Sequence, residues 1–67
     1  MTPFERKMNE KVERLYLRAT DRWVSVQEMG LCVGLDGAGH AAILRFVNQP
    51  NVKVKEEGGL RVYRTSR

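Results

Sequence analysis

The chain has 67 residues, of which 42% are hydrophobic and 30% are charged, and its formal net charge is +4 at pH 7. This length suits one small domain, and the balance of apolar and charged residues excludes an intrinsically disordered chain. No apolar run approaches the roughly 20 residues of a bilayer-spanning helix. We expect no secretory signal, because the N-terminal segment is charged and lacks an apolar stretch. We therefore expect a single soluble, cytoplasmic domain over residues 1–67, with no membrane as partner.

The positive charge is concentrated at the two ends of the chain. Residues 1–23 carry six basic and four acidic residues, residues 24–51 carry one and two, and residues 52–67 carry five and two. A basic balance is typical of proteins with a polyanionic partner, and it is also a common way to stay soluble. Charge alone therefore does not choose between these two readings.

The first predicted element is a helix over residues 3–19. Thr2 and Glu5 form a capping box, and Pro3 stands at the first helical position, where its missing N–H costs nothing. One side of this helix is apolar and is expected to face the core, namely Phe4, Met8, Val12, Leu15, Tyr16 and Ala19. Beside it runs a basic stripe, which is either a solvated edge or a row of phosphate contacts, formed by Lys7, Lys11, Arg14 and Arg18.

A short strand is predicted at residues 23–24, directly before a second helix. We interpret Trp23 as a lid on the core, because an indole buries a large area; the alternative is a stacking platform for a base. Ser25 and Glu28 form a second capping box, which predicts a helix over residues 26–33.

A glycine-containing turn then leads into a third helix over residues 37–48. Gly34 can adopt the left-handed conformation that ends the second helix. Leu35 is expected to enter the core, and Asp36 is placed to cap the third helix. Helix, turn and helix together form the helix-turn-helix pattern.

The C-terminal part of the chain predicts a β-hairpin over residues 52–64. Apolar and basic residues alternate on both sides of the turn Glu56-Glu57-Gly58-Gly59. Residues 65–67 are expected to be a frayed end. The apolar residues expected in or near the core are Val52, Val54, Leu60, Val62 and Tyr63.

This order of elements resembles the winged helix-turn-helix family from about Phe4 to Arg64. The resemblance is carried by residues 23–29 as strand and capped helix, by Gly34-Leu35-Asp36 as turn, by Ile43, Leu44 and Val47 as core positions of the third helix, and by the hairpin as wing. It implies an α+β, mostly α fold with three helices, a short strand and a C-terminal wing.

In the DNA-binding members of this family the third helix enters the major groove and the wing lies on the backbone or in the minor groove. Base reading usually uses Arg, Lys, Asn or Gln, and here the third helix offers Arg45 alone. His40 stands where the family usually has a core-facing residue, so we expect it to be half-buried, with a DNA contact as the alternative. On the third helix, the resemblance places Gly37 and Ala42 among the residues that face the groove. The DNA-binding residues that the resemblance implies are Ala38, His40, Ala41, Arg45, Lys53, Lys55, Arg61 and Arg64.

The sequence offers little for catalysis or metal binding. Cys32 is the single cysteine, and we interpret it as a packing residue. His40 and Asp36 lack a nucleophile beside them and a second cluster of ligands. We therefore expect no enzyme, no metal site and no cofactor.

Two main functions and one weaker alternative are compatible with these features. The first is duplex DNA binding by the wing and the third helix, as in a transcriptional regulator or an accessory factor for recombination or replication. The second is a protein-interaction module or homodimer, in which Ala38, Ala41 and Ala42, together with Leu31, dock on another chain. Binding of single-stranded nucleic acid through Trp23 and Tyr63 is a weaker third option.

Overall fold

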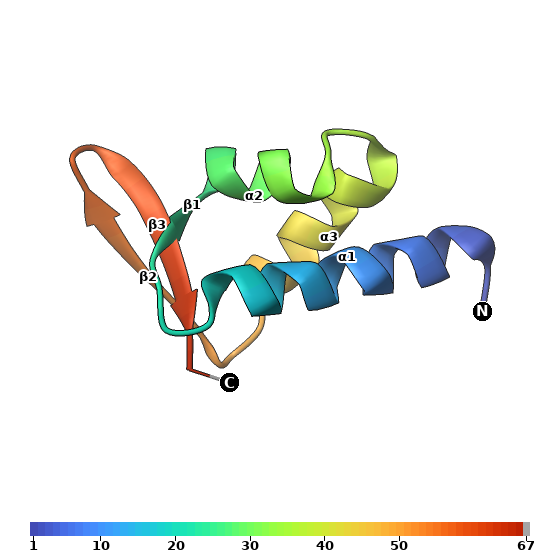
Figure 1. The fold of residues 1–67 in the computed structure, drawn as a ribbon, viewed down its shortest axis with the longest axis horizontal. Coiled ribbons are helices and arrows are strands. Elements are labelled where there is room, and N and C mark those ends of the chain that lie inside the picture. Colours follow the sequence, from blue (N-terminus) through green and yellow to red (C-terminus); the bar gives the residue numbers. More distant parts are fainter. Residues whose placement is uncertain (67) are drawn as a thin grey trace.

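The computed structural model describes residues 1–66, which form three helices and one three-stranded antiparallel sheet (Figure 1). The strands lie in the order β1-β3-β2, so the C-terminal strand is in the middle. This mostly helical α+β arrangement with a C-terminal hairpin is a winged-helix-like layout, and the predicted fold class is confirmed. Residue 67 of the expected domain lies outside the described residues. The elements are α1 Pro3–Ala19, β1 Val24–Ser25, α2 Val26–Val33, α3 Gly37–Val47, β2 Val52–Glu57 and β3 Leu60–Thr65.

Side-chain caps start the first two helices where the sequence predicts them. Thr2 Oγ1 accepts a hydrogen bond from the N–H of Glu5 at 3.1 Å, and the Glu5 carboxylate accepts from the N–H of Thr2 at 3.3 Å, which completes the first capping box. Ser25 Oγ accepts from the N–H of Glu28 at 3.1 Å. The Glu28 carboxylate lies 3.8 Å from Arg18. The serine half of the second capping box is therefore present, and the Glu28 carboxylate forms an ion pair that joins α2 to α1.

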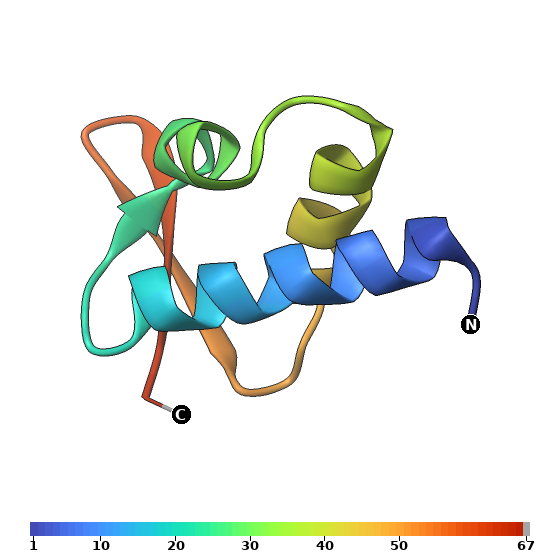
Figure 2. The ribbon, with the colours of Figure 1, turned by 45° about the vertical axis from the view of Figure 1, so that its right-hand side comes forward.

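The core lies between the helices and the side of the sheet that faces them (Figure 2). Phe46 of α3 is fully buried, and Tyr16 of α1 meets it edge-on, with ring centroids 5.0 Å apart and planes at 84°. Burial of such a side chain contributes about 1.5–3 kcal/mol, so this pair joins α1 to α3. The other buried apolar residues are Val12, Leu15, Ala19, Val24, Met29, Val33, Ala38, Ala42, Ile43 and Tyr63.

Two residues expected in the core are exposed at the end where α1 begins. Phe4 is 50% exposed, because the first turn of α1 meets only the start of α3, near Gly37. Leu35 is 84% exposed. Its side chain lies against Gly30 on the outside of α2, where the missing Cβ leaves room for it. The predictions for Phe4 and Leu35 are therefore wrong.

The predicted burial of the hairpin is also wrong toward its tip. Val54 is 56% exposed, because the hairpin projects past the helices and nothing covers its outer half (Figure 1). Leu60 is 49% exposed for another reason: it pairs with Glu57 and, like Val62 opposite Lys55, lies on the face of the sheet that turns away from the helices. Tyr63, nearer the base of β3, is buried as expected.

The strand register sorts the side chains of the sheet onto two faces. Residues directly opposite each other share a face, and successive residues alternate between faces. Val24 and Val54 both pair with Tyr63, and this face turns toward the helices. Lys53 pairs with Arg64, so these two cations share the other face. We call this second side the outer face of the sheet.

The C-terminal end is held more firmly than expected. Thr65 is buried and pairs with Val52 in the sheet. Its carbonyl accepts a hydrogen bond from the N–H of Asp21 at 2.8 Å, beside a bridge to Thr20. The prediction of a frayed end is therefore wrong for Thr65, and residue 67 lies outside the described part of the chain.

Candidate nucleic-acid interface

The exposed side of α3 forms a narrow stripe that differs from the predicted one. Ala38 is 5% exposed and Ala42 is fully buried, so neither methyl group can reach a base. His40 is exposed rather than half-buried, and the core position expected for it is wrong. We use the name α3 stripe for the four exposed residues of α3 and the partly buried Ala41 between them. The stripe consists of Gly37, His40, Ala41, Leu44 and Arg45.

The rotation of α3 about its axis follows from a contact between two glycines. A Cβ on Gly39 would lie 2.1 Å from the carbonyl oxygen of Gly34, so the helix can approach the turn this closely only because residue 39 has no side chain. Gly39 therefore faces inward. Its neighbour His40 is consequently turned to the solvent, and Leu44, one turn later, is half exposed instead of in the core.

A groove separates the C-terminal end of α3 from the hairpin. Its volume is about 520 Å³. Arg61 lies opposite Glu56 in the register, and both share the face of Tyr63, which turns toward the helices. The groove is lined by Val47, Asn48, Val54, Lys55, Glu56, Arg61 and Tyr63.

The four cations expected on the wing do not form one surface. Arg61 lies on the helix-facing side and Arg64 on the outer face, because they are three residues apart on β3. Lys53 and Lys55 share the outer face with Arg64. Glu56 and Glu57 are the last two residues of β2, opposite Arg61 and Leu60, and not part of the turn as predicted; they place two carboxylates next to the turn Gly58-Gly59. The structure therefore places Arg61 at the groove beside Val47 and Asn48 at the end of α3, whereas Lys53 and Arg64 lie on the outer face. Lys55 also lines this groove, although its ammonium group lies over Trp23.

The outer face of the sheet carries an aromatic residue among cations. Trp23 is half-buried there, and not a lid on the core. The ammonium group of Lys55 lies 4.4 Å from the centroid of the Trp23 ring, and the guanidinium carbon of Arg64 lies 5.9 Å from it. A hollow of about 180 Å³ at this place is lined by Trp23, Lys53, Arg64 and Ser66.

The basic stripe expected on α1 is interrupted. Lys11 turns inward, where its ammonium group donates to the backbone carbonyl of Val33 and lies 3.7 Å from Asp36 Oδ1. Arg18 is paired with Glu28. Neither residue can therefore contact a phosphate without losing a contact within the fold.

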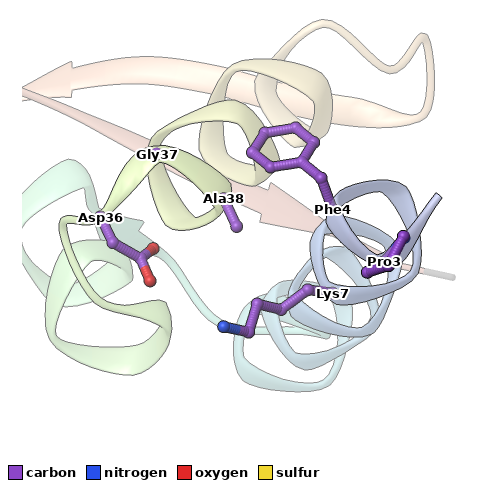
Figure 3. A pocket seen from close by; sticks show the side chains of 6 residues that line it. All are labelled: Pro3, Phe4, Lys7, Asp36, Gly37 and Ala38. Carbon is purple, nitrogen blue, oxygen red and sulfur yellow. The ribbon is translucent and has the colours of Figure 1, made fainter.

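The start of α3 is occupied by its own cap. Asp36 Oδ1 accepts a hydrogen bond from the N–H of Gly39 at 2.8 Å. This bond, together with the positive charges of Lys11 and Lys7, lowers the pKa of the Asp36 carboxyl group against an opposing effect of partial desolvation. Lys7 points toward Asp36 in Figure 3, and Phe4 stands beside the helix start. A negative carboxylate here repels a phosphate group, so this end of α3 does not serve as an anion site.

An apolar patch lies along α2 and the turn that follows it. Leu31 is 89% exposed, and Leu35 lies next to it across Gly30. Val26 and Gln27 complete the lining of a hollow of about 390 Å³. We call these residues the α2 patch. Large apolar side chains exposed side by side are typical of contacts with another protein.

Within residues 1–66 no three His, Cys, Asp or Glu side chains are grouped so that they could hold a metal ion. None of the helices in this range is long and apolar enough to cross a bilayer. Comparisons of the chain with protein-family models, curated protein sequences and solved structures gave no match.

Proposed function

We propose that this protein is a small DNA-binding protein that docks on a duplex through the α3 stripe and the helix-facing side of the hairpin. The observation that carries the proposal is the position of Arg61, which lines the groove beside the end of α3. No carboxylate of residues 1–66 lies within 4.0 Å of the guanidinium groups of Arg61 or Arg45. Both charges are therefore available to phosphates.

The composition of the α3 stripe determines how such a protein would read DNA. Ala41 and Leu44 can contact a thymine methyl group, and Arg45 can donate to a base edge or to a phosphate. The exposed ring of His40 supplies one more donor. Few directed hydrogen bonds are available, so the affinity would be mainly electrostatic and only weakly dependent on sequence. A regulator or an accessory factor for recombination or replication could work in this way.

An electrophoretic shift assay with a random duplex at two ionic strengths tests this proposal. We expect a complex in dilute buffer that weakens steeply as salt is added, because bound phosphates release counterions. Absence of a complex in dilute buffer would contradict DNA binding.

The alternative function is a protein-interaction module or a homodimer, and the α2 patch favours it. Leu31 and Leu35 are the most exposed large apolar residues on this side of the molecule. Ala38 and Ala42, two of the residues expected at such a contact, are buried and cannot form it. Light scattering after size exclusion separates the two functions: a monomer that binds duplex supports the first, and a dimer that ignores duplex supports the second.

A further inference from the structure

We propose that the hollow between Trp23, Lys53, Arg64 and Ser66 on the outer face of the sheet is a binding site for a phosphate group of a nucleic-acid backbone. The inference rests on the proposed function for the source of the phosphate. It adds a second contact surface, separate from the α3 stripe.

The lining of the hollow matches the chemistry of a phosphate group. Lys53 provides an ammonium group, Arg64 a planar guanidinium fork and Ser66 a hydroxyl donor. No carboxylate of residues 1–66 lies within 4.0 Å of the Lys53 ammonium group. The volume of about 180 Å³ is several times the roughly 30 Å³ that one water molecule occupies in the liquid. The hollow is thus large enough for a phosphate group, and the positive charge of Lys53 in its wall is not compensated by a carboxylate.

Trp23 contacts one cation that lines the hollow, Arg64, and one beside it, Lys55, whose ammonium group also lies 3.0 Å from a carboxylate oxygen of Glu57. Its ring has the Lys55 ammonium group 4.4 Å from the centroid and the Arg64 guanidinium carbon 5.9 Å from it. A cation is attracted to the face of an indole ring. Side chains that are already ordered lose less freedom when they bind. The indole therefore helps to order Arg64 in the wall of the hollow.

One carboxylate competes with the proposed ligand. Asp21 Oδ1 lies 3.7 Å from the guanidinium group of Arg64. Asp21 has a left-handed backbone, with φ of 56°, in the turn between α1 and β1. Asparagine tolerates this conformation as well as aspartate does. The substitution Asp21→Asn therefore removes the competing charge and keeps the turn.

Trp23 is the single tryptophan of the chain, so its fluorescence reports directly on the hollow. The experiment titrates the full chain with a short DNA duplex and, separately, with inorganic phosphate replacing chloride at constant ionic strength. The variants are Lys53→Gln and Asp21→Asn. Lys7→Gln and Glu10→Gln, both on α1, change the net charge by the same amounts and serve as matched controls.

We expect the duplex to change the emission of Trp23 in a saturable way. Lys53→Gln should weaken duplex binding several-fold more than Lys7→Gln and reduce the salt slope by about one unit. Asp21→Asn should strengthen binding several-fold more than Glu10→Gln. Inorganic phosphate should produce a weaker change of the same emission, which Lys53→Gln reduces.

The two proposals fail in different ways. A duplex complex seen by electrophoresis, with unchanged Trp23 emission and variants that match their controls, would overturn the phosphate site and leave DNA binding through α3 intact. Absence of any duplex complex would overturn the proposed function. In that case a saturable response of Trp23 to inorganic phosphate would still support the hollow as a phosphate site, and no response to either titrant would overturn it.

Discussion

The ammonium group of Lys11 in the middle of α1 donates a hydrogen bond to the backbone carbonyl of Val33, the last residue of α2. The last carbonyls of a helix have no partner within the helix, and a cation near them is favourable. Lys11 also lies 3.7 Å from Asp36, the cap of α3. One side chain therefore connects all three helices, and it does so with only 14% of its surface exposed.

Replacing Lys11 by methionine should destabilise the fold. The substitution keeps the apolar stem and removes the charged donor, so the Val33 carbonyl loses its partner in a part-buried place. Loss of a hydrogen bond to a charged group costs about 1.5–3 kcal/mol. The measurement is the free energy of unfolding from urea titration. Lys7→Met on the same helix is the control, since Lys7 is exposed, and an equal loss in both variants would contradict the role given to Lys11.

The contact between Gly39 and Gly34 can be tested by adding one methyl group. Gly39→Ala would place a Cβ 2.1 Å from the Gly34 carbonyl oxygen, and such overpacking against backbone costs about 1–3 kcal/mol or more. Gly37→Ala adds the same group where its nearest neighbour is 3.8 Å away, on Phe4. Thermal unfolding should show a large loss for Gly39→Ala and little change or a gain for Gly37→Ala. Two variants of equal stability would contradict the close approach that orients α3.

The stability of the fold should depend on pH through Asp36. Its pKa is lowered in the folded state, first by the hydrogen bond from the Gly39 N–H and then by Lys11 and Lys7. A depressed carboxyl pKa contributes stability above the unfolded value of about 3.9, and this contribution is lost as the pH falls through the folded pKa. Asp36→Asn keeps a side chain that can cap a helix. The difference in stability between parent and variant should therefore shrink on acidification from about pH 6 to below pH 3. A difference that is constant over this range would contradict the assignment.

Most of the secondary structure could be predicted because the signals are local. Thr2, Ser25 and Asp36 cap helices that begin at the next residue, and the alternation in the hairpin marks both of its strands. The boundaries differ by one residue in three places: the third helix ends at Val47 and not at residue 48, the short strand is Val24–Ser25 and not residues 23–24, and the hairpin ends at Thr65 and not at residue 64. Each of these features depends on residues only a few positions apart.

The candidate site was harder to predict because it depends on contacts between elements. The exposure of His40 follows from the approach of Gly39 to Gly34. The place of Trp23 beside Arg64 follows from the pairing of β1 with β3, which lie far apart in the chain. The alternation of Lys53 and Lys55 showed that they share a face, but not that Trp23 lies on it. Periodicity shows which residues share a face, and tertiary packing decides what that face meets.

The salt dependence of duplex binding in the variants Arg45→Ala and Arg61→Ala tests the central claim most directly, because these two residues define the proposed docking side. The parent should bind a random duplex with an affinity that falls linearly with salt on logarithmic axes. Each variant should bind more weakly at all sequences and lower the slope by about one unit for the lost phosphate contact. An affinity and slope equal to those of the parent in both variants would show that the α3 stripe and the helix-facing side of the hairpin do not contact DNA.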